Sequence, residues 1–267
     1  RSRGLGDVYK RQVQPRRIDG PRRRHPHLMV ASTWRMEPLA FKEMWEHFDY
    51  EYLPYPLQVR PTSPTTEEYL AERAIAIDQA IATVSDWYTP ALEALTNPEV
   101  RVEMFGVWAE SRLRAHVGIR GEIACVVTQS EGRDDDAGGE VVLRAVRTED
   151  VGRALAKQLS VKAATPAREW RFASARDDAD EQAKRRELQT VMANGVVAVV
   201  PVGVHPGPGI DWSPNALTQS FEIVSVRDHG DLVVNKAARQ VVSATPDRVA
   251  KAFDTYISAV KRVYEQS

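Results

Sequence analysis

Regular alternation of apolar and polar residues in the middle of the chain constrains its fold most. Apolar side chains occupy every second position at Val100, Val102 and Met104. Successive side chains of a strand point to opposite faces of a sheet, so this period of two predicts a half-buried strand. Arg120-Gly121 gives a tight-turn signal between two later segments. We expect these later strands over residues 113–119, 122–129 and 141–146, in an antiparallel sheet.

Helix signals lie before and after these strands. Thr65 and Thr66 precede two glutamates, which is a helix-start signature. Apolar residues then recur at helical spacing and predict a long helix that packs on the sheet: Leu70, Ala74, Ile77, Ile81 and Val84. Capping patterns at 148–150 and 245–247 predict two further helices. Shorter helices are expected over 38–48, 90–95 and 177–192.

The second half of the chain repeats this organisation. Val196 to Val204 is a continuous apolar run of strand length, which predicts a strand in the centre of the sheet. Further strands are expected over 170–173, 219–226 and 232–235. The two capping patterns lie 97 residues apart, which suggests related halves. We therefore predict an α+β fold, with a central antiparallel sheet flanked by helices and a quasi-two-fold arrangement of two similar halves. The single domain would span 29–267, with halves 36–160 and 161–267.

Residues 1–28 differ from the rest of the chain. Residues 1–27 hold nine basic and two acidic residues, so they carry +7 of a total charge of −1, and the remainder carries −8. We interpret residues 1–28 as an unstructured or non-native tail that looks like a translated sequencing adapter. A basic arm could also belong to a nucleic-acid binder. This alternative stays open, although the acidic body disfavours it and we expect no nucleic-acid partner.

Hydropathy favours a soluble, cytoplasmic protein. No apolar run approaches the roughly 18 residues that a membrane-spanning helix needs, so we expect no membrane insertion. No segment resembles a signal peptide. Cys125, the single cysteine, lies in the apolar run 123–127 and is interpreted as a buried residue rather than a catalytic thiol.

Motifs with catalytic spacing are missing from the sequence. It contains no Gly-rich phosphate loop, G-x-S-x-G, H-E-x-x-H or C-x-x-C. The histidines are scattered, so we expect neither a metal site nor a cofactor. His205 with Asp211, or His229 with Asp228 and Asp231, could form a hydrolase dyad, but no activated nucleophile is evident. We expect that the chain is not an enzyme and keep a hydrolase as an alternative.

Two tryptophans lie in predicted loops. Trp108 falls in 105–111, an expected hairpin connection, where a large apolar side chain has no obvious local core. A tryptophan in such a loop is a candidate binding anchor. The alternative is that it folds back onto its own sheet. Trp212, in the predicted loop 205–214, is the second candidate.

One connector identifies a family. Leu53-Pro54-Tyr55-Pro56-Leu57 cannot be helical, because each proline lacks an N–H and restricts the residue before it. Together with segments 98–102, 113–117 and 124–127 and the cap at 243–247, it resembles the EspG family, the cytosolic chaperones of type VII (ESX) secretion in actinobacteria. The segment 228–231 departs from the family's usual pattern, which affects the details of partner recognition more than the fold.

The resemblance implies a chaperone that binds the hydrophobic tip of the PPE subunit in a PE–PPE heterodimer. Such a chaperone keeps the heterodimer soluble and delivers it to its secretion system, whose machinery would be a further partner. By analogy with the family, binding is expected on the hairpin 106–111 and on the C-terminal half. The candidate partner-binding residues are Gly106, Val107, Trp108, Glu110, Trp212, Phe221 and Tyr264.

Overall fold

A computed structural model describes residues 32–85, 90–134, 137–164, 166–173, 179–209 and 217–266. All of them belong to one compact unit, Ala31–Ser267. The predicted tail, 1–28, and Trp212 lie outside the described residues. The division of the chain into a tail and one domain therefore stays a prediction.

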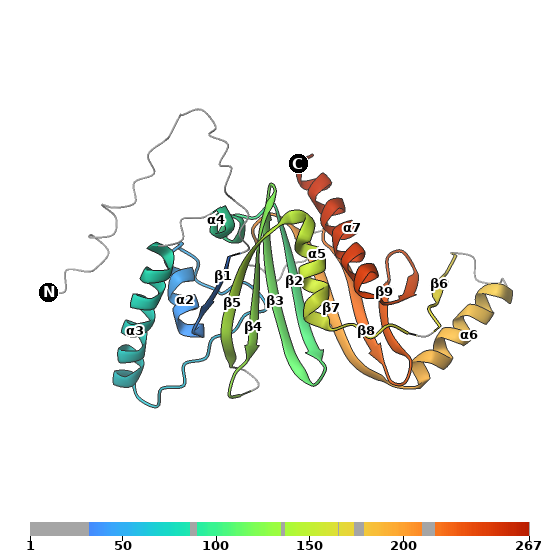
Figure 1. Cartoon of the computed structure of the whole chain (residues 1–267), viewed down its shortest axis with the longest axis horizontal. Coiled ribbons are helices and arrows are strands. Elements are labelled where there is room, and N and C mark those ends of the chain that lie inside the picture. The colour runs from blue at the N-terminus through green and yellow to red at the C-terminus, as the bar shows by residue number, and fades with distance from the viewer. Residues whose placement is uncertain are drawn as a thin grey trace. The chain divides into compact units, whose positions relative to one another are not determined.

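The centre of this unit is a ten-stranded antiparallel sheet with the order β1-β5-β4-β3-β2-β7-β8-β9-β10-β6. Its strands are β1 (Thr33–Met36), β2 (Val100–Trp108), β3 (Ser111–Arg120), β4 (Ile123–Glu131), β5 (Gly138–Arg147), β6 (Glu169–Arg171), β7 (Val196–Pro206), β8 (Gln219–Val226), β9 (Gly230–Asn235) and β10 (Gln240–Ser243). Figure 1 shows helices flanking this sheet. The predicted α+β class is confirmed.

Two helices cover one face of the sheet. These are α5 (Val151–Leu159), which follows a short 3-10 turn at Thr148–Asp150, and α7 (Pro246–Tyr264). In α7 the Thr245 hydroxyl accepts a hydrogen bond from the backbone N–H of Arg248, as the capping pattern predicted. The helix buries Val249, Phe253 and Val260 at helical spacing. These side chains share the main core with Val102 and Met104 of β2 and with Val202 of β7.

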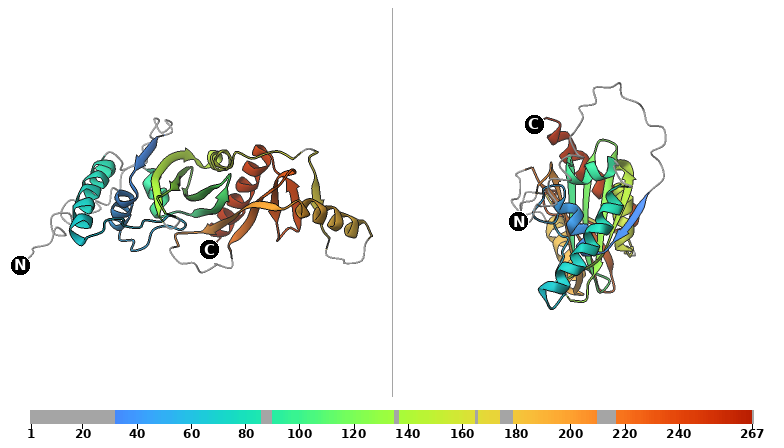
Figure 2. Two further views of the ribbon diagram at one scale, coloured as in Figure 1. Left: turned by 90° about the horizontal axis from the view of Figure 1, so that it is seen from below. Right: turned by 90° about the vertical axis from the view of Figure 1, so that its left-hand side faces the viewer.

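The opposite face carries two separate apolar clusters. The first lies under α2 (Pro38–Glu46) and α4 (Pro90–Thr96) and includes Cys125 and Val127 of β4. The second lies under α6 (Ala179–Ala193) and includes Trp170, Val224 and Leu232. Figure 2 shows α2 towards one end of the sheet and α6 towards the other. Helices on this face therefore pack on the flanks of the sheet.

The strand order separates the chain into two blocks. Strands β1 to β5 form one side of the sheet, strands β6 to β10 form the other, and β2 and β7 join them. The boundary between the halves near residue 160 stays a prediction. A quasi-two-fold relation between the halves stays a prediction.

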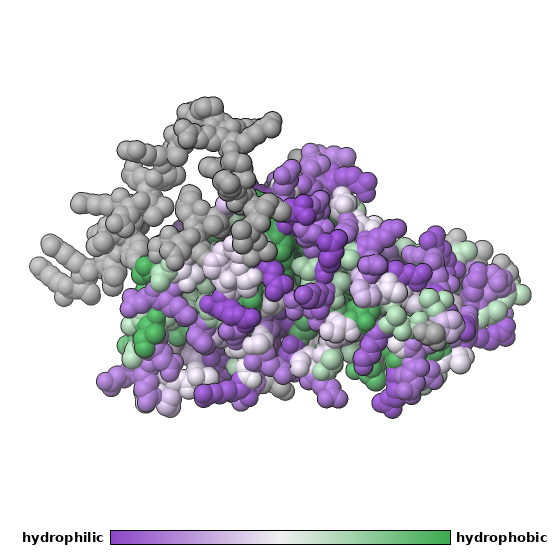
Figure 3. All heavy atoms as spheres, in the orientation of Figure 1, coloured by the Kyte–Doolittle hydropathy of each residue, from purple (hydrophilic) through white to green (hydrophobic). Residues whose placement is uncertain are grey.

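The long helix α3 (Thr66–Ser85) begins where predicted, but its packing differs from the expectation. It packs on α2 through the small residues Ala76 and Ala80, and Arg73 donates two hydrogen bonds to the buried carboxylate of Glu43, at 2.7 and 3.1 Å. The aliphatic stripe that was expected to face the sheet is exposed, with Leu70 55% and Ile77 36% accessible. Figure 3 shows hydrophobic surface over α3. Helical spacing revealed the stripe but could not reveal which side of the helix would be covered.

The predicted hairpin loop at 106–111 is mostly strand. β2 continues to Trp108 and β3 starts at Ser111, so the turn consists of Ala109 and Glu110 alone. Trp108 belongs to the main core, at 8% exposure, because the alternation that starts at Val100 continues to it. The expectation that Trp108 lies in a loop without a local core was wrong.

We expect Glu110→Gly to stabilise this turn. Ala109 and Glu110 have φ of 48° and 69°, a left-handed conformation that costs a residue with a Cβ roughly 1 kcal/mol. Glycine removes that strain, so the free energy of unfolding in urea should rise by about 0.5 to 1 kcal/mol. Glu110→Gln, which keeps the Cβ, is the matched control and should leave stability unchanged. Destabilisation by the glycine would contradict this account of the turn.

Candidate functional site

The face of the sheet opposite α5 and α7 exposes apolar side chains where β2 meets β7. These strands pair from Val100–Pro206 to Met104–Val202, and continuing this register places Val107 opposite Val199. Both are exposed, at 42% and 40%, and Val197 is 52% exposed. With the half-buried Phe105 and the exposed Tyr55 they form an apolar surface. We call Tyr55, Phe105, Val107, Val197 and Val199 the open strip.

The proline-rich connector fixes one border of the open strip. Its Tyr55 ring lies 6.2 Å from the Phe105 ring, measured between centroids. The Tyr55 carbonyl lies 2.8 Å from Nδ1 of His116 on β3. Beyond it, Gln58 and Gln129 exchange two hydrogen bonds, at 2.9 and 2.6 Å. The connector is non-helical, as predicted, and straps the N-terminal helices onto β3 and β4.

A buried polar cluster lies on the same face, next to the open strip. Arg101 is 5% exposed and its Nε donates to Glu103 at 2.9 Å. Its guanidinium also donates to the Gly207 carbonyl at 3.0 Å. His205 Nε2 lies 3.2 Å from the second oxygen of Glu103. Because buried charges are costly unless they are paired, this network fixes β2 and β7 at their junction.

Burial and neighbouring charges shift the pKa values of this cluster. Burial would raise the pKa of Glu103, but the hydrogen bond from His205 and the charges of His205 and His116 outweigh it, so that pKa is lowered. Burial dominates at His116 and lowers its pKa, although the Glu103 charge and the Tyr55 carbonyl act in the opposite direction. His116 therefore stays neutral in the folded chain at pH values where an exposed histidine begins to protonate.

Acidification should destabilise the fold through His116. Its folded pKa lies below its unfolded pKa, so below about pH 6.5 the unfolded chain binds a proton that the folded chain does not. Above that pH, His116 should cause no change in the free energy of unfolding. As the pH drops towards 5, protonation of the unfolded chain at His116 should lower the free energy of unfolding. In urea titrations His116→Gln should show a shallower fall in the free energy of unfolding than the wild-type chain. The lowered pKa of Glu103 contributes in more acidic solution. Parallel profiles for the two proteins would refute this role of His116.

The structure separates the predicted binding residues into exposed and buried ones. Val107 belongs to the open strip, Glu110 lies in the exposed turn beside it, and Tyr264 is 38% exposed at the end of α7. Gly106 faces β7, where an added Cβ would lie 2.6 Å from the Val199 carbonyl oxygen. Tyr55, Val197 and Val199 of the open strip were not among the binding residues predicted from the sequence.

Two of the predicted binding residues, Trp108 and Phe221, are core residues. The Trp108 indole N–H donates a hydrogen bond to the Leu159 carbonyl at the end of α5. Phe221 is 2% exposed, and its ring packs edge-on against Phe253 with the centroids 5.1 Å apart. Both side chains therefore support the sheet beneath α5 and α7. Whether any of the predicted residues contacts a partner stays a prediction.

The described residues around His205 form only part of the catalytic arrangement that the hydrolase alternative requires. His205 has Glu103 on one ring nitrogen and the Thr218 hydroxyl, at 3.0 Å, on the other. Asp211 lies outside the described residues. The Glu103 carboxylate is shared with Arg101, and threonine is a hindered secondary alcohol, so this arrangement is better suited to holding the junction together than to activating a nucleophile. Burial raises the pKa of the Cys125 thiol to about 12, which keeps it protonated.

His229 and Asp231 also occupy structural positions. Asp231 is 1% exposed and accepts a hydrogen bond from the Lys162 N–H at 2.6 Å. The His229 ring lies 6.4 Å from the Trp170 ring, between centroids. Within the described residues no group of three or more His, Cys, Asp or Glu could hold a metal ion. None of the described helices is long and apolar enough to cross a membrane.

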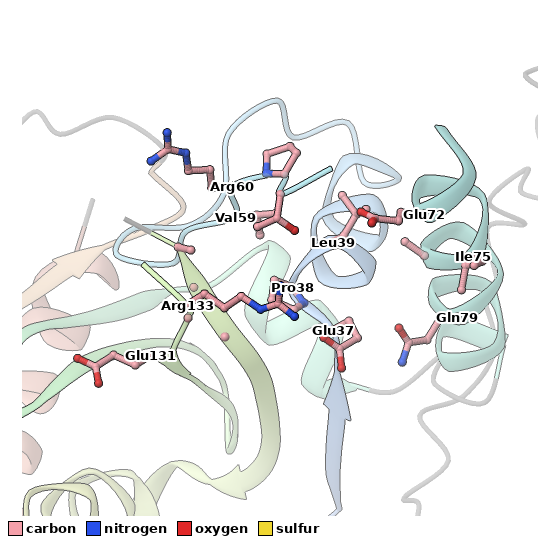
Figure 4. A pocket seen from close by; sticks show the side chains of 17 residues that line it. Glu37, Pro38, Leu39, Val59, Arg60, Glu72, Ile75, Gln79, Glu131 and Arg133 are labelled. Atoms are coloured by element: carbon pink, nitrogen blue, oxygen red, sulfur yellow. The ribbon is translucent and has the colours of Figure 1, made fainter. Parts of the chain in front are cut away.

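A groove of about 670 Å³ lies between the start of α2, α3 and the β4–β5 connection (Figure 4). Leu39, Val59 and Ile75 give it apolar walls, and Glu37 and Arg133 give it charges of both signs. Its described lining residues include no predicted binding residue and no residue of the open strip. We therefore place the candidate site at the junction of β2 and β7.

These features define an α+β sheet protein that exposes an apolar strip beside a buried ionic cluster. A family model for the EspG family matches residues 37–256, so the chain belongs to the EspG family. The resemblance predicted from the connector is confirmed.

A solved structure agrees with this fold. The chain is similar to the Mycobacterium tuberculosis type VII secretion system chaperone EspG5, solved in complex with a PE25-PPE41 dimer, with a TM-score of 0.50 and 11% identity. The match covers 86% of this chain and 95% of that chain. An oleoyl thioesterase from Lactobacillus plantarum gives a TM-score of 0.16 at 10% identity, over 80% of this chain and 98% of that chain, which carries no structural argument. A search of curated protein sequences gave no significant match.

Proposed function

We propose that the chain is a cytosolic chaperone of type VII (ESX) secretion. It would bind the hydrophobic tip of the PPE subunit in a PE–PPE heterodimer, keep the heterodimer soluble and direct it to its secretion system. Membership of the EspG family supports this function, as does the shared fold with a chaperone solved in complex with a PE–PPE dimer.

The open strip is the observation that carries the proposal. An apolar surface at the centre of a sheet, next to polar groups, has the composition of a protein-binding core with a polar rim. The strip presents aliphatic and aromatic side chains in the same surface, as Val107, Val199 and Tyr55 do. These groups suit the apolar tip of a helical bundle, because they bury area without requiring matched hydrogen bonds.

The predicted contact residues fit this surface to different degrees. Val107 and Glu110 would contact the partner directly, at the hairpin end of the β2–β7 junction. Tyr264 would contact it near the other end, since it lies beside Gly207 at the end of β7. Trp108 and Phe221 would act by holding the strands from below. In this proposal the protein works by binding and not by catalysis, as one domain spanning 29–267.

Co-expression with the PE–PPE pair from the same locus tests this function. Size-exclusion chromatography with light scattering should give a complex of one chaperone, one PE and one PPE chain. The complex should survive deletion of residues 1–28, which separates it from binding through the basic tail. Failure to form a complex with any PE–PPE pair of the source genome would reject the proposal.

A further inference from the structure

The exposed side of α3 is unusually apolar for a surface helix. Leu70 is 55% exposed, Ile77 36% and Ile81 41%, and these three side chains lie on one side of the helix. Ala74 lies exposed beside them. A helix with one partner normally places its large apolar residues towards that partner and polar residues towards water. Here Ala76, Ala80 and Arg73 face α2, and the large aliphatic residues face outwards.

The charges around this apolar side are acidic. At 100° per residue, Glu67 and Asp78 fall on one line along the helix, three turns apart, beside the stripe of Leu70, Ala74 and Ile77. Both carboxylates are exposed. Arg73, on the other border, is already neutralised by Glu43 at 2.7 Å. The stripe therefore presents an aliphatic surface with a negative rim.

We propose that this side of α3 binds an amphipathic helix of a partner protein, whose apolar stripe is bordered by lysine or arginine. Helices pack by laying apolar ridges together, and opposite charges at the border select the partner. Leu70 to Ile81 spans about 16 Å, enough to receive three turns of such a helix. This surface belongs to different elements from the open strip, so the proposal does not depend on PE–PPE binding.

The negative rim argues against two other occupants. If a second copy of the chain packed its α3 antiparallel about a two-fold axis, the rims of Glu67 and Asp78 would face each other and repel. Anionic lipid headgroups would meet the same carboxylates. A basic helix is the occupant whose charge complements this surface.

Two synthetic amphipathic peptides of about 18 residues test the proposal. Both carry leucines at helical spacing, and they differ only in flanking lysines or flanking glutamates. In fluorescence anisotropy with the full chain, the lysine peptide should bind at least about tenfold more tightly, and added salt should reduce the difference. Leu70→Ser with Ile77→Ser should weaken binding of the lysine peptide about tenfold or more, whereas Leu217→Ser, an exposed aliphatic residue outside both α3 and the open strip, should not.

Reversing the charge of the negative rim gives a second, independent test. Glu67→Lys with Asp78→Lys should transfer the preference from the lysine peptide to the glutamate peptide, and Asp180→Lys with Glu149→Lys should not. Thermal melting checks that each variant folds, which is expected because all of these side chains are exposed. Equal binding of the two peptides, binding unaffected by the α3 variants, or no binding at all would overturn the proposal. So would a dimer that Leu70→Ser with Ile77→Ser converts to monomer, since a second copy would then occupy the stripe.

Discussion

Val107→Arg combined with Val199→Arg is expected to weaken binding of the PE–PPE heterodimer by at least about 100-fold. The two valines lie opposite each other across the β2–β7 junction and are 42% and 40% exposed, so the arginines should not disturb the folded chain. In the complex they would place two guanidinium groups in an apolar contact, where an unpaired charge is costly. Titration calorimetry with purified PE–PPE measures the effect.

Ile75→Arg is the matched control for this experiment. Ile75 is also a strongly exposed aliphatic residue, but it lies on α3, away from the open strip. Its substitution should leave PE–PPE affinity unchanged. If the double variant, folded by circular dichroism, bound PE–PPE as tightly as the wild-type chain, the partner surface would have to lie elsewhere.

Trp108→Ala should lower the free energy of unfolding by about 3 to 5 kcal/mol. The indole ring fills the main core below α5, and its N–H satisfies the Leu159 carbonyl at the end of that helix. Truncation leaves a cavity and an unpaired carbonyl. Urea unfolding followed by circular dichroism gives the value. Trp108→Phe keeps most of the packing and should lose clearly less stability.

The neighbouring strand position distinguishes this structural role from a binding role. Val107→Ala, one residue away on the exposed face, should change stability by no more than about 0.5 kcal/mol. If Trp108→Ala left stability nearly intact and still abolished PE–PPE binding, Trp108 would be a binding anchor and its position in the core would not describe the bound state.

Local signals in the sequence predicted most of the elements, although strand β1 was not predicted and β2 extends into the predicted loop 106–111. The helix-start pattern at Thr65 corresponds to hydrogen bonds between the Thr65 hydroxyl and both the N–H and the carboxylate of Glu68. Alternation predicted β2, because Val100, Val102 and Met104 on one face of this strand lie in the main core. The cap at Thr245 predicted α7 for the same kind of local reason.

Which apolar side chains are buried and which are exposed depends on tertiary contacts, and the sequence alone could not predict it. Val196 to Val204 is apolar throughout, which predicts burial on both faces, yet Val197 and Val199 are exposed. They form a surface only because β7 pairs with β2, roughly 90 residues earlier in the chain. Likewise, the stripe on α3 has helical spacing whether it faces a core or water. Helical periodicity identifies an apolar face but not its neighbour.

The pairing of β2 with β7 also has a consequence during synthesis. The ribosome completes β2 about 90 residues before it reaches the start of β7. Chains grow at about 5 to 20 residues per second. For several seconds the nascent chain therefore carries a β2 whose outer backbone edge has no partner, and such an edge can pair with other chains. The proposed chaperone would thus pass through an aggregation-prone interval of its own, which ends only when β7 closes the sheet.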